Sequence, residues 1–132
     1  MPPKSAPFPG LNPFLGLVGT RRWLARLAEI RDIAASGPRT GQAIRQRHGI
    51  ELSLERLRNN PGTKPSAAEH LLGRIAAETA RVAANLTSTG HDRLVEQLRT
   101  SLSGENTLIP LFHLIRTAML QRSTLVRISP GR

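Results

Sequence analysis

Glycine and proline recur along this chain at intervals that leave room only for short regular elements. Breaks stand at Gly37-Pro38, Gly49, Pro61-Gly62, 87–90 and Ser103-Gly104. Glycine readily adopts the backbone that ends helices, and proline cannot continue one, so each break should end an element. Between the breaks, apolar residues recur three and four positions apart, which is the spacing of one helix face. The sequence therefore predicts a series of short helices.

The predicted fold class is all-α, a small bundle of about six helices with an extended N-terminal arm rich in proline and glycine. Much of the hydrophobic 39% of the 132 residues is alanine and leucine, which favour helices over sheets. We expect an arm over 1–19, a helical domain over 20–122 and a tail over 123–132. Within the domain, 20–60 and 66–122 should form three helices each. These are expected at 20–36, 40–48, 53–60, 66–86, 91–102 and 107–121.

The two ends of the chain should lack regular structure of their own. Five prolines restrict the backbone of residues 1–19, which predicts an extended arm. Its large apolar side chains would form an exposed patch, so we expect them to be buried against the body or a neighbouring subunit. In the tail, residues 124–128 alternate as a strand does but have no partner strand. They are predicted to be coil, or an edge strand added to a partner. The apolar residues of the arm are Phe8, Leu11, Phe14 and Leu15.

Two helices have specific signals. Ser66 and Glu69 follow Pro65 and have the spacing of a capping box, in which each side chain accepts from the other residue's backbone amide. The last helix holds Pro110 in its first turn, where no intrahelical bond is lost. Apolar residues cover most of this last helix, so it should lie in the core or in an interface.

The charge points to a polyanionic partner. The formal net charge is +10, and 17 arginines but only two lysines supply the positive charge. Nucleic acid, an anionic membrane surface or an acidic protein would each attract such a chain. The alternatives are a role in solubility alone, and a GC-rich coding sequence that favours arginine. No apolar stretch is long enough to span a membrane.

Residues 40–60 outline a helix-turn-helix. One short helix would end at Gly49, a turn would follow, and a second helix would run from Ser53 to Asn60 with Leu54 and Leu57 inward. The alternative is a corner of the core with no nucleic-acid role. On the first hypothesis the protein binds nucleic acid, DNA in the first place. The predicted contact residues are Arg39, Arg45, Arg47, Arg56, Arg58, Asn59 and Lys64.

A second hypothesis makes the chain a structural or assembly subunit. Its apolar arm and last helix would then pack on other chains, or on further copies of itself. The interface residues predicted on this hypothesis are aromatic: Phe8, Phe14, Trp23 and Phe112. Binding of single-stranded RNA by base stacking is disfavoured, because the basic segment contains no aromatic residue.

Catalysis is not expected. The sequence has no nucleophile motif, no glycine-rich phosphate loop and no zinc-binding helix, so we predict no enzyme activity and no cofactor. The absence of cysteine excludes disulfides and thiolate metal sites, and it fits a reducing, cytoplasmic compartment. The four histidines are almost evenly spaced, but none lies within helical reach of another. We therefore predict no metal site.

Overall fold

The structure, a computed structural model, describes residues 10–59 and 64–128, with 123–128 described by their backbone alone. Within these residues the secondary structure is entirely helical, which confirms the all-α class. The sequence predicted about six helices, and the described residues form seven. They are α1 (Leu11–Val18), α2 (Thr20–Ala34), α3 (Pro38–Arg47), α4 (Gly49–Asn59), α5 (Ala67–Ala84), α6 (Ser88–Ser101) and α7 (Ile109–Ile128).

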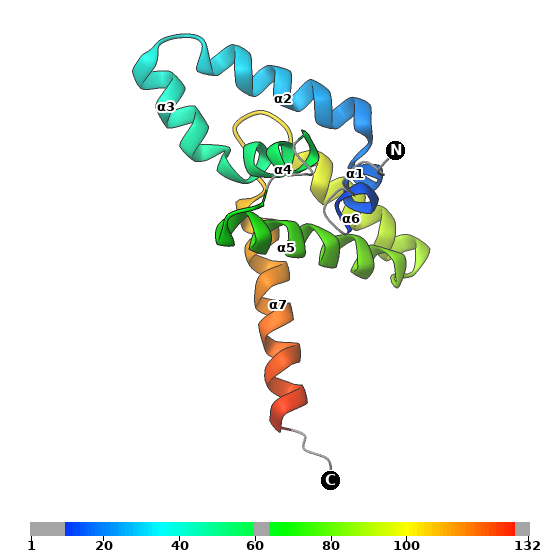
Figure 1. Cartoon of the computed structure of the whole chain (residues 1–132). Helices are drawn as coiled ribbons and strands as arrows, with labels where there is room; N and C mark the ends of the chain where they lie inside the picture. The colour runs from blue at the N-terminus through cyan, green and yellow to red at the C-terminus, as the bar shows by residue number, and fades with distance from the viewer. Residues whose placement is uncertain (1–9, 60–63, 129–132) are drawn as a thin grey trace, which may run out of the picture.

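The helix α5 lies at the centre of the arrangement. It contacts α1, α4, α6 and α7, whereas α3 has α2 and α4 as its main neighbours. In Figure 1, α2 and α3 form a pair of helices at the top of the molecule, above α4 and α5. The helix α7 begins in the body and continues away from it, below α5 (Figure 1). The molecule therefore has a packed centre and two parts that extend from it.

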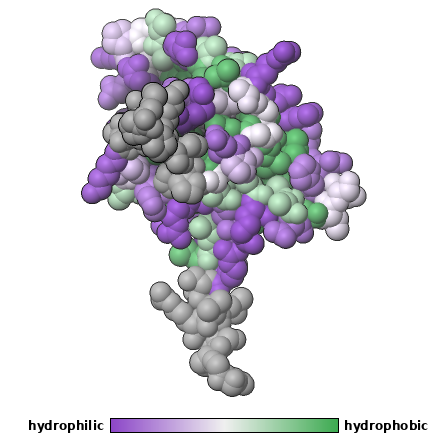
Figure 2. Space-filling view, turned by 45° about the vertical axis from the view of Figure 1, so that its right-hand side comes forward, coloured by the Kyte–Doolittle hydropathy of each residue, from purple (hydrophilic) through white to green (hydrophobic). Residues whose placement is uncertain are grey.

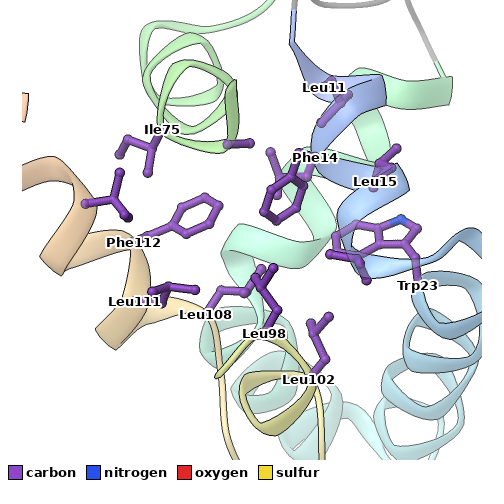
Figure 3. Packing of buried hydrophobic residues seen from close by; sticks show 14 of the residues in the cluster. Leu11, Phe14, Leu15, Trp23, Ile75, Leu98, Leu102, Leu108, Leu111 and Phe112 are labelled. Atoms are coloured by element: carbon purple, nitrogen blue, oxygen red, sulfur yellow. The ribbon is translucent and has the colours of Figure 1, made fainter. Parts of the chain in front are cut away.

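Three aromatic side chains from distant parts of the chain meet in the core (Figure 3). Phe14 lies edge-to-face against Trp23, with ring centroids 6.4 Å apart, and against Phe112 at 5.8 Å. This geometry sets the positive edge of one ring on the negative face of the next. The three side chains are 0%, 1% and 2% exposed. The contact joins α1, α2 and α7.

The prediction of an extended arm is wrong for residues 11–18, which form α1. Pro13 is the third residue of this helix, where its missing amide breaks no intrahelical bond. Burial of Leu11, Phe14 and Leu15 against the body is confirmed. At the start of the helix Gly10 has a φ of +83°, and a Cβ there would collide with Ala77 of α5. Residues 1–9, including Phe8, lie outside the described residues.

Local signals at the helix ends had mixed success. The capping box at Ser66 is confirmed: the Ser66 hydroxyl accepts from the Glu69 amide at 3.1 Å, and Glu69 accepts from the Ser66 amide at 2.9 Å. The prediction of coil or an added strand at 124–128 is wrong, because α7 continues to Ile128. A β-branched run is compatible with a helix when the helix before it has already formed, because propensity is a weak preference.

Only one side of α7 packs on the body. Leu111, Phe112 and Ile115 are buried, and Arg122 bonds to Glu78 of α5 at 2.6 Å. Hydrogen bonds from Arg81 and Arg122 lower the pKa of Glu78 to about 2, although its burial opposes them. Large apolar side chains remain exposed along this helix, namely Ile109, Leu114 and Leu120. Over the described part of the chain, no helix combines the length and the apolar character that crossing a membrane requires.

Replacing Phe14 by alanine should destabilise the fold strongly. Loss of a buried phenylalanine removes its transfer free energy and leaves a cavity, which together cost about 3–5 kcal/mol. Urea unfolding followed by circular dichroism measures the change in the free energy of unfolding. Asn12→Ala, at an exposed position of the same helix, is the control and should change this free energy by less than about 0.5 kcal/mol. Equal effects of the two substitutions would contradict burial of α1 in the core.

Candidate nucleic-acid interface

The helix α3 is the most exposed of the basic helices. Proline at its first position suits the helix start, where an amide would lack a partner. Gly41 is its one buried residue, and Ile44 is half-buried beside it. The remaining positions up to Arg47 are exposed. A helix that buries so little of itself presents most of its side chains to a partner.

The buried glycine explains how α3 sits on α2. A Cβ at Gly41 would lie 2.6 Å from the backbone oxygen of Ala34, at the end of α2. Real side chains do not tolerate that distance, so only glycine allows the two backbones to approach this closely. The approach fixes one side of α3 against α2 and turns the opposite side outward.

The side of α3 turned away from Gly41 carries arginine and glutamine. At 100° per residue, Arg39 and Gln46 lie opposite the buried side, with Gln42 on one flank and Arg47, beyond Ala43, at the margin of the other. We call these four residues the outer α3 face, and all four are exposed. The sequence of α3 contains no carboxylate. The face therefore offers positive charge and amide groups with no acidic side chain of its own helix among them.

The corner between α3 and α4 is not the turn that the sequence predicted. The sequence placed a glycine turn at 49–52, but Gly49 is the first residue of α4 and His48 alone separates the two helices. His48 and Glu51 are both buried, with Nδ1 and Oε2 3.3 Å apart. The other oxygen of Glu51, Oε1, has no hydrogen-bond partner among the described residues. A buried polar pair thus shapes the corner, and the helices lack the three- to four-residue turn of a helix-turn-helix.

The Glu55 carboxylate accepts hydrogen bonds from two of the three predicted contact residues on α4, Arg58 and Asn59. Arg58 donates to it from Nε at 2.8 Å and from Nη2 at 2.6 Å. Asn59 donates from Nδ2 at 3.0 Å. From the core side, the Trp23 indole donates to the same carboxylate at 2.8 Å. Arg56, although exposed, pairs with Glu69 at 3.1 Å.

These contacts explain the titration behaviour of Glu55. Partial burial by itself would raise its pKa, but the hydrogen bonds from Arg58, Trp23 and Asn59 outweigh burial, and the pKa lies below its ordinary value. The same contact raises the pKa of Arg58. Both groups are therefore held in their charged forms as a pair. The negative charge of Glu55 offsets the positive charge of Arg58, so Arg58 attracts a phosphate less strongly.

The predicted contact residues thus fall into two groups. Arg39, Arg45, Arg47 and Lys64 are exposed, and no ion pair within 4 Å joins any of them to another described residue. Arg45 folds along α3 beside Gly41 and lines a pocket of about 250 Å³ between α2 and α4. The second group, on α4, is paired with carboxylates. Sequence reasoning missed Gln42 and Gln46, although helical spacing around Gly41 could have identified them.

The three predicted interface aromatics that the structure describes have almost no exposed surface for a partner. Trp23 and Phe112 both pack on Phe14 inside the chain's own core, as described above. Their burial in the core explains why these positions are aromatic, with no need for an interface. Phe8, the fourth, is outside the described residues.

Comparison of the chain with protein-family models, with curated proteins and with solved structures found no match. Among the described residues, no group of three or more histidine, aspartate or glutamate side chains could hold a metal ion. The charge and exposure of α3 are therefore the features on which a functional assignment rests.

Glu55→Gln should make the free energy of unfolding less dependent on pH in acid. A carboxylate whose pKa is lowered by folding stabilises the fold at pH values above the pKa that it has in the unfolded chain. This contribution is lost as the pH falls through the lower pKa of the folded state. For Glu55 the loss of stability should begin near pH 4.5, which is the ordinary pKa of the group, and continue at lower pH. Urea unfolding at about pH 7 and about pH 3 measures the difference.

The control for this experiment is Glu105→Gln, at an exposed carboxylate between α6 and α7. We expect the control to keep the wild-type pH dependence. An unchanged pH dependence in the Glu55 variant would show that the carboxylate does not stabilise the fold through its charge.

Proposed function

We propose that this protein binds nucleic acid through the outer α3 face, with duplex DNA as the favoured ligand and without catalysis. The single observation that carries the proposal is the composition and exposure of this face. Arg39 and Arg47 are exposed, are not ion-paired to any described residue and share a helix with no carboxylate. Phosphates attract such guanidinium groups, and contacts to phosphate supply most of the affinity for nucleic acid.

The amide side chains on the same face suit base edges. Glutamine can bond to adenine in two places, and arginine can bond to guanine in the same way. Gln42 and Gln46 lie between Arg39 and Arg47 along the helix, and Gln46 shares the outermost side with Arg39, so both kinds of group would reach one groove together. A single helix fits the major groove of B-form DNA, which is about 12 Å wide. The position of α3 at the edge of the fold leaves its outer side accessible (Figure 1).

Charge and aromatic placement favour a duplex over a single strand. The segment from Thr20 to Arg47 contains seven arginines and two carboxylates, so half of the net charge of +10 lies on α2 and α3. Hydrophilic side chains cover much of the face seen in Figure 2. Stacking of unpaired bases needs exposed aromatic rings. In the described part of the chain the aromatic side chains are Phe14, Trp23 and Phe112, and all are buried.

In this proposal α4 supports the interface and α3 enters the groove. A helix-turn-helix would place its second helix in the groove, but the arginines of that helix, Arg56 and Arg58, are paired with Glu69 and Glu55. The Glu55 carboxylate connects that helix to Trp23 and so to the core. The helix α4 thereby holds the corner from which α3 projects.

Replacing Arg39 and Arg47 together by glutamine should reduce the salt dependence of DNA binding. Each phosphate contact contributes about 0.9 to the slope of log affinity against log salt, so the slope should become shallower by about two units. Fluorescence anisotropy of a labelled duplex over a series of salt concentrations measures it. Circular dichroism should stay unchanged, since both side chains are exposed.

The matched control removes the same charge elsewhere. Arg74 on α5 and Arg116 on α7 are exposed and are also replaced by glutamine. We expect this double variant to keep the wild-type slope to within about one contact. If the two double variants lose the same slope, DNA binding depends on total charge, and α3 is not the interface.

A second candidate function, that of an assembly subunit, is favoured by the apolar side of α7. Leu114 is 60% exposed and Leu120 is 57% exposed. In Figure 2 apolar and hydrophilic surface lie side by side where α7 leaves the body. A second copy of the chain is the partner to test, because a twofold interface presents the same patch from both sides.

Light scattering on a sizing column tests this second candidate. If α7 assembles the protein, the wild type should have a mass above that of one chain, and Leu114→Glu with Leu120→Glu should return it to one chain. The DNA affinity of this variant distinguishes the two candidates. A wild type that runs as one chain at all concentrations would exclude self-assembly through α7.

A further inference from the structure

A pocket of about 600 Å³ lies between the first half of α2 and the end of α6. Four arginines line it, with Glu29 as the one carboxylate among its lining residues. Its volume is within the range of small-molecule sites. Part of its wall is apolar, from Val18 and Leu102 among others. The four arginines are Arg21, Arg22, Arg26 and Arg99.

The start of α2 borders this pocket and has no acidic side chain of its own to offset its partial positive charge. Gly19 caps the helix without a side-chain hydrogen bond, and the first turn contains no acidic residue. Helix starts carry a partial positive charge and favour acidic side chains. Here the first turn contains Arg21 and Arg22 instead, both exposed and without an ion pair to any residue that the structure describes. Like charges gathered at a helix start are unfavourable until an anion binds among them.

Arg26 forms the inner wall of the pocket and is held rigidly. It is 3% exposed, and its guanidinium donates to the backbone oxygens of Gly104 at 3.0 Å and Asn106 at 2.7 Å. Glu29 accepts from it at 3.3 Å. Its Nε is buried and has no partner among the described residues. The carboxylate of the pocket is thus already paired, so the charges of Arg21 and Arg22 are not neutralised.

Arg99 closes the pocket from the side of α6. Its partner Glu96 is 4.0 Å away, and both side chains are more than half exposed. Exposed pairs at this distance contribute little. Arg99 can therefore turn towards an anion bound at the start of α2. Its guanidinium, together with those of Arg21 and Arg22, presents enough donors for more than one phosphate group.

We infer that this pocket binds a phosphorylated small molecule of the nucleoside diphosphate class. The diphosphate lies at the start of α2 between Arg21, Arg22 and Arg99, and the organic group lies against the apolar wall. The inference is separate from the proposed function. A helix of 15 residues is about 22 Å long. The pocket is lined by the first half of α2, and α3 follows the other end of that helix (Figure 1).

The test uses the full chain and calorimetric titration with ADP, pyrophosphate and adenosine. We expect ADP and pyrophosphate to bind and adenosine alone to bind at least tenfold more weakly than ADP. Arg21→Gln with Arg22→Gln should weaken ADP and pyrophosphate at least tenfold. Both positions are exposed, so this variant should retain the wild-type circular dichroism. The variant of Arg39 and Arg47 described above removes equal charge and should bind ADP as the wild type does.

The outcomes separate this inference from the proposed function. Tighter binding of ADP than of pyrophosphate supports the inference, and equal affinities overturn the nucleoside class, because the organic group then contributes nothing. The inference is overturned if neither anion binds, or if both double variants weaken ADP equally. It is also overturned if the change at Arg21 and Arg22 lowers the DNA salt slope as much as the change on α3 does. Failure of DNA binding alone leaves the expected ADP results in place.

Discussion

The edge-to-face contacts of Phe14 with Trp23 and Phe112 join the beginning and the end of the described chain in one core. They bring α7 against α1 and α2, two helices that are neighbours in the sequence. Trp23 also donates from its indole to Glu55, which extends the same contact to α4. The corner that carries α3 is therefore connected to the core by this hydrogen bond, in addition to the buried side chains of Leu54 and Leu57. Removal of the ring cluster would affect the candidate interface as well as stability.

Features determined by neighbouring residues could be predicted from the sequence, and those determined by tertiary contacts could not. The capping box at Ser66 depends on two residues three apart, so its pattern was sufficient. The helix α1 was missed because the prolines of residues 1–19 were counted without their positions, and the one proline within α1, Pro13, falls in its first turn. The extension of α7 was missed because the alternating β-branched residues of its end were considered apart from the helix before them.

The candidate site shows the same division. The exposed arginines of α3 follow from helical spacing around Gly41 and could be placed from sequence. The pairing of Arg56 with Glu69 joins two helices across a connection, and no local pattern indicates it. The Glu55 contacts with Arg58 and Asn59 are within helical reach, but the third partner, Trp23, comes from another helix. Arginines that look alike in the sequence therefore have different roles: Arg26 fixes a loop, Arg58 holds a carboxylate, and Arg39 faces outward.

The small buried area of α3 has a consequence for binding energetics. Apart from Gly41 it has no fully buried residue, so its separation from α2 would expose little apolar surface. Segments with few buried contacts open locally at a free-energy cost well below that of global unfolding. A ligand that requires α3 packed on α2 binds only the molecules in which the two helices are packed. The measured affinity is therefore lower in proportion to the fraction of molecules in which α3 has separated from α2. Substitutions at the α2–α3 contact can therefore change affinity for a ligand that they never touch.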